Sequence, residues 1–118
     1  MMLLTKAIRE ALPPLYSQDG LGLDAVAYVK FFTPDSNWTW WASEGCALVE
    51  TDEDDYKEVP LKEAGDDYLD VLFFGLVSGH ERELGYFMLS ELQSATGPLG
   101  LHIERDLHFK PTKLKDLP

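Results

Sequence analysis

The chain has 118 residues, with 21 acidic and 10 basic side chains, so its formal charge at pH 7 is -11. This length fits one globular domain and excludes a two-domain enzyme, and the 12% of aromatic residues exclude a disordered acidic chain. The charge balance excludes a general nucleic-acid binder, because affinity for phosphates comes from Lys and Arg.

The first forty residues predict a short helix followed by a β-hairpin. Thr5 can cap a helix that runs to Leu12, and Pro13-Pro14 ends it. The elements that follow alternate between turn-forming and β-type composition. In order, they are a turn or loop at residues 17–22, a strand at 25–32, a turn at 33–37 and a strand at 38–42.

The second half of the chain predicts three strands and one helix. A nearly continuous apolar run over residues 68–78 predicts a strand that is buried on both faces. Ser90 starts a helix in which Gln93 can close a capping box, and Gly97-Pro98 ends it. The other elements are a turn at 79–83, a strand at 84–88, a strand at 102–109 and a polar tail at 111–118.

This order of elements predicts an α+β fold, with a mainly antiparallel sheet and two short flanking helices in a single domain over residues 1–118. The single cysteine, Cys46, excludes an intrachain disulfide and fits a reducing compartment. No apolar run approaches the roughly 20 residues that span a bilayer. We therefore expect a soluble, cytoplasmic protein without a membrane partner.

Most of the negative charge lies in one segment. From Glu50 to Asp70 there are ten acidic residues and two lysines, a net charge of -8 in 21 residues, while the other 97 residues carry -3. Like charges at this density repel, which predicts an exposed loop inserted at about residues 45–70. Two interpretations are open: a solvated loop without a role, and an arm that docks on a basic partner. The candidate partner-binding residues are Asp52, Glu53, Asp54, Asp55, Asp66 and Asp67.

Ionisable residues alternate along the last predicted strand. His102, Glu104, Asp106 and His108 would share one face, because side chains in a strand point alternately to its two faces. Such a face could bind a metal or perform acid–base chemistry. The two histidines are about 20 Å apart at the strand rise, so they cannot share one ion. The alternative is a solvent-facing strand with ion-paired carboxylates.

Tryptophans and polar residues are concentrated around the predicted hairpin turn. Trp38 and Trp40 should project from one face of the strand and Trp41 from the other. One interpretation is a buried core beside a capped turn. The other is an aromatic platform for a ligand or partner, with Asp35 and Asn37 supplying hydrogen bonds at its rim.

Other catalytic patterns have little support. Ser78-Gly79-His80 does not form a nucleophile elbow, and Cys46 has no neighbouring base in the sequence. A calcium loop starting at Asp52 is excluded, because Lys57 stands where the turn needs glycine. We expect no metal and no cofactor.

A set of motifs spread over nearly the whole chain carries a family resemblance. The motifs are Leu12-Pro13-Pro14-Leu15-Tyr16, the run from Ala27 to Trp40, Phe73-Phe74-Gly75-Leu76-Val77, Glu83-Leu84-Gly85-Tyr86-Phe87, Leu89-Ser90-Glu91-Leu92, Gly100-Leu101, Ile103-Glu104-Arg105-Asp106 and Phe109-Lys110-Pro111. Together they resemble the small proteins grouped as domain of unknown function family 2958. The resemblance implies an accessory protein of a bacterial conjugative plasmid, integrative element or phage, and it implies no reaction.

The chain departs from the family pattern in two places. The family resemblance implies a short acidic linker where this chain has residues 45–70, so the acidic segment is an expansion specific to this version. The family often has proline at position 102, which weakens a role for His102. The candidate binding residues within the motifs are Asp35, Asn37, Trp38, Trp40, Tyr86, Glu104, Arg105 and Asp106, with Glu83 as a further residue to test.

Two functions remain open from the sequence. The first is a non-enzymatic protein-binding module that engages a host or mobile-element protein with a basic surface, with an anti-defence role if the acidic segment mimics DNA. The second is a small metal-dependent or acid–base hydrolase that uses Glu104, Asp106 and a histidine. We prefer the first, in which the chain binds a protein and no nucleic acid directly.

Overall fold

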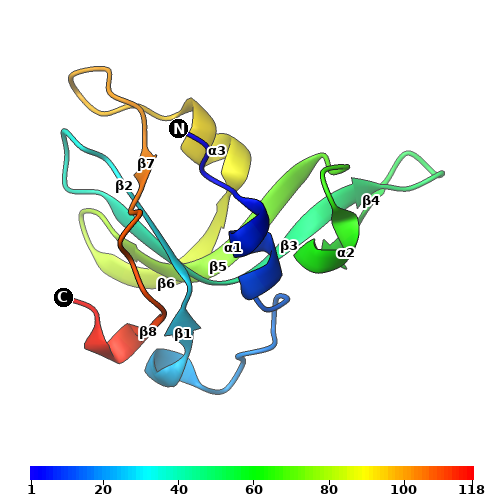
Figure 1. The fold of residues 1–118 in the computed structure, drawn as a ribbon, viewed down its shortest axis with the longest axis horizontal. Helices are drawn as coiled ribbons and strands as arrows, with labels where there is room; N and C mark the ends of the chain where they lie inside the picture. The colour runs from blue at the N-terminus through cyan, green and yellow to red at the C-terminus, as the bar shows by residue number, and fades with distance from the viewer.

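One long central strand, β3, organises the sheet of this protein (Figure 1). The computed structural model describes all of residues 1–118. The α-helices are α1 (Lys6–Ala11), α2 (Leu61–Ala64) and α3 (Leu89–Ser94), and two 3-10 helices are η1 (Gly22–Asp24) and η2 (Leu114–Asp116). The strands are β1 (Val26–Ala27), β2 (Val29–Phe32), β3 (Thr39–Glu50), β4 (Tyr56–Pro60), β5 (Asp70–Ser78), β6 (Arg82–Met88), β7 (Glu104–Arg105) and β8 (Thr112–Lys113).

The main sheet is antiparallel throughout, as the sequence predicts. Its strand order is β6-β5-β3-β2-β7, and β4 pairs with the second half of β3. β1 and β8 form a separate two-stranded ribbon. The predicted hairpin over residues 25–42 is confirmed, with Phe31 opposite Trp40 in the β2–β3 pair. No helix of the structure combines the length and apolar character needed to cross a membrane.

A β-bulge between Ala42 and Glu44 interrupts the pairing of β3 with β5. The extra residue, Ser43, is buried, and its hydroxyl donates to the Phe74 carbonyl over 3.0 Å. The bulge changes which side chains point to each face, because side chains alternate along a strand. Trp41 and Glu44 therefore lie on the same side of the sheet although they are three residues apart.

The inner face of the sheet carries the main hydrophobic core. Phe31, Phe73 and Phe87 come from three neighbouring strands, and the ring of Phe73 lies 5.7 Å from that of Phe31 and 5.4 Å from that of Phe87. Helices and the N-terminal segment cover these rings with buried leucines. These leucines are Leu3, Leu4, Leu12, Leu61, Leu89 and Leu92.

The outer face of the sheet is covered only in part. At one end, the β1–β8 ribbon and η2 bury Trp41 and Leu76, with Leu114 packed against them. In the middle, Leu15 from the loop after α1 packs on Cys46 and Leu48. The remainder of this face, along β5 and β6, stays open to solvent.

The predicted helices are present, with one shift. Thr5 caps α1 as predicted, because its hydroxyl accepts the N–H of Ile8. α3 begins at Leu89, one residue before the prediction, and the predicted capping box of Ser90 and Gln93 is wrong. Instead, the Glu91 carboxylate accepts the N–H of Met88 over 2.9 Å, and the Ser90 hydroxyl donates to Asp70. The fold has three short α-helices where two were predicted, because α2 lies within the acidic segment.

The acidic segment is not the loop that its charge density predicted. Residues 45–50 continue β3, residues 56–60 form β4 and residues 61–64 form α2, so only residues 51–55 and 65–69 are irregular. Charge does not prevent this hairpin, because β4 is an edge strand whose acidic side chain can point to solvent.

Two further predictions of extended structure differ from the observed fold. The strand expected at residues 102–109 is reduced to Glu104–Arg105, because the Asp106 carboxylate accepts the N–H of His108 and turns the chain. The strand expected at 68–78 is buried mainly on its inner face. The expected polar tail contains β8 and η2, and it buries Leu114.

Two glycines that face each other in the β5–β6 pair provide a matched stability test. A Cβ on Gly75 would overlap the backbone carbonyl of Trp41, whereas a Cβ on Gly85 would meet open space. We expect Gly75→Ala to lower the free energy of unfolding by about 3 kcal/mol and Gly85→Ala to change it by about 0.5 kcal/mol or less. Urea denaturation of both variants measures this difference, and equal stabilities would contradict the close approach of β3 and β5.

Candidate functional site

The acidic residues 50–58 are held on an ordered β-hairpin that projects from the sheet (Figure 1). Its turn is closed by backbone and side-chain hydrogen bonds. The Thr51 N–H donates to the Asp55 carbonyl over 2.8 Å, and the Asp55 carboxylate accepts the N–H of Tyr56. Asp54 adopts a left-handed conformation with φ 57°, which Asp tolerates better than most residues. The carboxylates are therefore presented on a defined backbone.

Four of these carboxylates come together in one groove. Glu50, Asp52 and Asp54 from the hairpin and Asp67 from the segment before β5 line a cavity of about 490 Å³. None of the four takes part in an ion pair. We call this cavity the acidic groove.

The other predicted partner-binding acids lie outside the acidic groove. Glu53 and Asp55 are exposed on the hairpin turn. Asp66 is ion-paired with Arg9, which also donates to the Gly65 carbonyl, so this carboxylate joins α1 to the end of α2. Of the six predicted partner-binding acids, Asp66 is therefore ion-paired within the fold, and the other five form no ion pair.

Two tyrosines mark the open part of the outer face. Tyr16 and Tyr86 are 53% and 55% exposed, and the Tyr86 ring packs edge-on against Phe74 with centroids 4.9 Å apart. The Glu58 carboxylate on β4 raises the pKa of the Tyr16 hydroxyl, with burial and the neighbouring Tyr86 adding to the effect. The outer face therefore carries aromatic side chains beside a carboxylate of the hairpin.

A buried carboxylate that the sequence analysis missed holds the loop between α1 and β1. Glu44 is 3% exposed, and its two oxygens accept the N–H groups of Tyr16 and Gln18 over 2.9 and 2.7 Å. The Gln18 side chain in turn bonds to the backbone of Val26 and Ser43. The signal in the sequence was the polar pair Ser43-Glu44 in the middle of an apolar strand, which marks the bulge.

The tryptophans divide between the two faces as predicted. Trp38 and Trp40 stack with centroids 5.9 Å apart, and His80 packs edge-on against Trp38 at 5.6 Å. Trp41 is buried in the opposite cluster. The Asp35 carboxylate contacts the loop after α3: one oxygen accepts the Leu99 N–H and the other is buried against Gly97. Asn37 is exposed.

The ionisable residues of the C-terminal segment do not share one strand face, so that prediction is wrong. Only Glu104–Arg105 is a strand; Glu104, Asp106 and His108 border a shallow depression of about 290 Å³, and Glu104 also lines another cavity together with His102. Asp106 is ion-paired with Lys30 over 3.6 Å. The Arg105 side chain donates to the Met2 carbonyl and so anchors the N-terminal segment. No group of three or more His, Cys, Asp or Glu side chains converges as a metal site would require.

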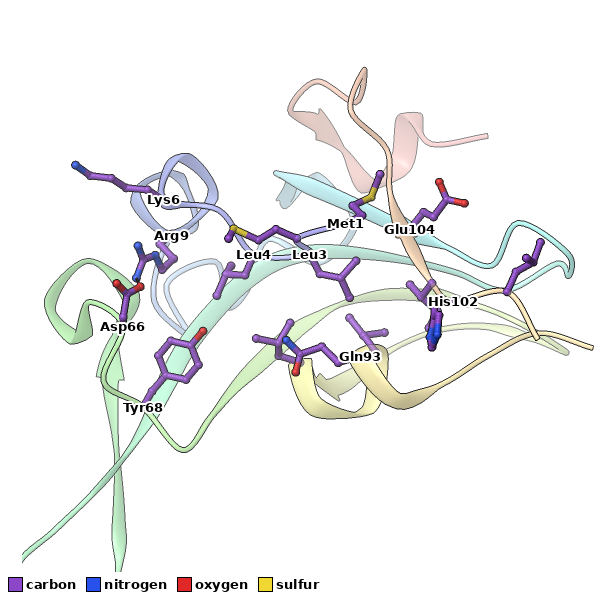
Figure 2. A pocket seen from close by; sticks show the side chains of 15 residues that line it. Met1, Leu3, Leu4, Lys6, Arg9, Asp66, Tyr68, Gln93, His102 and Glu104 are labelled. Carbon is purple, nitrogen blue, oxygen red and sulfur yellow. Dashed lines mark hydrogen bonds and ion pairs between the residues drawn. The ribbon is translucent and has the colours of Figure 1, made fainter. Parts of the chain in front are cut away.

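The largest cavity lies between the N-terminal segment, α1, α3 and the chain before β7 (Figure 2). It has a volume of about 800 Å³, and most of its lining residues are apolar. Its charged residues lie toward opposite ends: Arg9 and Asp66 point toward each other at one end, and Glu104 lies at the other (Figure 2). The Arg9–Asp66 pair already satisfies its charges, so this cavity lacks a convergent polar group that would define a ligand.

Cys46 should behave as an unreactive thiol. Burial, with a smaller effect of the Glu58 carboxylate, raises the pKa of the Cys46 thiol to about 11. The reactive thiolate is therefore scarce near pH 8, and the packed outer face also blocks access. We expect labelling by a chromogenic disulfide reagent at pH 8 to be at least about 100-fold slower in the folded protein than in urea. Rapid labelling of the folded protein would show that this part of the face opens.

Comparison with known proteins supports the family resemblance over slightly less than half of the chain. Residues 61–115 match the family model described as Protein of unknown function (DUF2958). No curated protein and no solved structure matches the chain. The matched residues run from α2 to η2, so they exclude the hairpin turn and β4 as well as the motifs before residue 40. Residues 61–115, which are 55 of the 118 residues, are therefore similar to the DUF2958 family of proteins of unknown function.

Proposed function

We propose that this protein is a non-enzymatic module that binds a protein partner with a basic surface through the acidic groove. The observation that carries the proposal is the meeting of four free carboxylates, Glu50, Asp52, Asp54 and Asp67, in one cavity of the fold. Lysine and arginine side chains of a partner would complement this charge.

The order of the hairpin favours binding over a purely solubilising role. Five residue pairs join β3 to β4, and the turn between them is closed by its own hydrogen bonds. A partner therefore meets carboxylates that are already positioned and pays little conformational entropy for them. A disordered acidic arm would lack this advantage.

We propose one class of target from the mobile-element context that the family resemblance implies. Nucleic-acid-binding channels are basic, so an acidic hairpin that takes the place of phosphates would compete with DNA for such a channel. An anti-defence role would follow if that channel belongs to a host defence protein. Competition by duplex DNA for the captured partner tests this specific form of the proposal.

The hydrolase alternative has weaker geometric support. Its proposed base, Asp106, is engaged by Lys30 and by the N–H of His108, and Glu104 lies beside it in a shallow depression. His108 borders the same depression, but it bonds to Asp106 through its backbone N–H and not through its imidazole. We therefore retain the binding function alone.

Removal of charge from the acidic groove tests the proposal. We expect the triple variant Asp52→Asn/Asp54→Asn/Asp67→Asn to bind its partner about tenfold more weakly, because each exposed charge pair contributes roughly 0.5 kcal/mol. The measurement is capture of proteins from an extract of the native host at about 50 and 300 mM salt, followed by titration of the captured partner.

A matched variant controls for net charge. Glu10→Gln/Glu81→Gln/Asp116→Asn removes the same charge from exposed positions outside the acidic groove. This control should keep its affinity and the salt sensitivity of the wild type. An equal loss of affinity in both variants would show that only the net charge of the protein matters. Unchanged capture by the first variant would refute the acidic groove as the binding site.

A further inference from the structure

A small hollow on the outer face has a buried carboxylate in its lining. The hollow has a volume of about 160 Å³ and lies between the loop before β1 and the β3–β5–β6 surface. Glu44 lines it, although this side chain is 3% exposed in total. A buried carboxylate beside an unfilled space is unusual, because a buried charge is normally matched by an opposite one.

The hydrogen bonds of Glu44 leave its charge without a counter-ion. Each carboxylate oxygen accepts one backbone N–H, from Tyr16 and from Gln18, which leaves further lone pairs free on both oxygens. None of the ion pairs of the protein includes Glu44. Asp19 also borders the hollow, and no Lys, Arg or His lines it.

The walls of the hollow suit a flat cationic group with an apolar stem. Phe74 and Leu84 line the side formed by the sheet, and Leu84 is 41% exposed at the surface. Gly20 and Gly22 line the opposite side in left-handed conformations, with φ of 84° and 55°. Because glycine has no side chain, the loop leaves the space beside the carboxylate open.

We propose that this hollow receives an arginine side chain of the protein partner, whose guanidinium group pairs with Glu44. A guanidinium is planar, donates two parallel hydrogen bonds to a carboxylate and packs well against an aromatic ring such as Phe74. The source of the arginine rests on the proposed function, in which the partner is a basic protein. The hollow would then give specificity to an interaction that the acidic groove strengthens through general charge.

A small cation tests the hollow without any knowledge of the partner. Titration with n-butylguanidinium, followed by NMR, should give saturable shifts of the amide signals of Gln18, Gly20 and Gly22. The neutral analogue n-butylurea has nearly the same shape and should give shifts at least tenfold smaller at the same concentration. Equal responses to both compounds, or no saturable response to n-butylguanidinium, would refute a cation site at Glu44.

A variant that supplies its own cation avoids disturbing the Glu44 hydrogen bonds. Leu84→Lys places an ammonium group at the wall of the hollow and should weaken n-butylguanidinium binding at least tenfold. Leu99→Lys adds the same charge at a position that is 79% exposed and does not line the hollow, so its binding should remain within twofold of the wild type. Equal weakening in both variants would show only a change in net charge.

Two further measurements separate this inference from the proposed function. A capped Leu-Arg-Leu peptide should bind more tightly than n-butylguanidinium, because its leucines can contact the outer face, and equal affinity would overturn a protein-borne arginine in favour of a small free cation. The triple variant of the acidic groove should bind n-butylguanidinium normally. Unchanged partner capture by the triple variant, with saturable n-butylguanidinium binding by the wild type, would refute only the acidic groove. Weakened capture by the triple variant, with no saturable n-butylguanidinium response of the wild type, would refute only the hollow.

Discussion

The bulge in β3 is the constraint on which the rest of the structure depends. The first half of the strand pairs with β2 and the second half with β4, while β5 runs along both halves and the one extra residue, Ser43, shifts the β3–β5 register. The bulge shifts the alternation of side chains by one residue, and apolar side chains lie on both faces of this twelve-residue strand. It also turns Glu44 to the outer face, where its carboxylate fixes the loop that carries Leu15 and Tyr16.

The negative charge of the chain is divided according to its surroundings. The hairpin carboxylates lie at the edge of the sheet and in water, where repulsion among them is screened and costs the fold little. Glu44 is shielded from water, so its backbone hydrogen bonds must compensate for lost hydration. A single charge at Glu44 therefore has more influence on the fold than several charges at the hairpin tip.

Local sequence patterns predicted the elements that depend on neighbouring residues. Thr5 and Pro13 define α1, and the tryptophan strand and its partner form the expected hairpin. Charge density predicted a loop at residues 45–70, but β4 pairs with β3 in a hairpin that places Glu50 opposite Tyr56, and composition does not reveal this pairing. The strand predicted from the alternating ionisable residues at 102–109 is shorter than expected, because the Asp106 carboxylate accepts the N–H of His108 and ends the strand. The meeting of Asp67 with the hairpin acids is likewise a product of tertiary structure.

The boundary of the family match runs through the proposed interface. β5 and β6, which supply Phe74 and Leu84, lie within residues 61–115, whereas Glu44, β4 and the hairpin turn lie before them. Asp67 belongs to the matched part, so the acidic groove joins a family position to a segment outside the match. The hairpin is an edge element whose exposed acids contribute little to the core. Its charge can therefore vary without loss of the sheet, and such variation would adapt one scaffold to different basic partners.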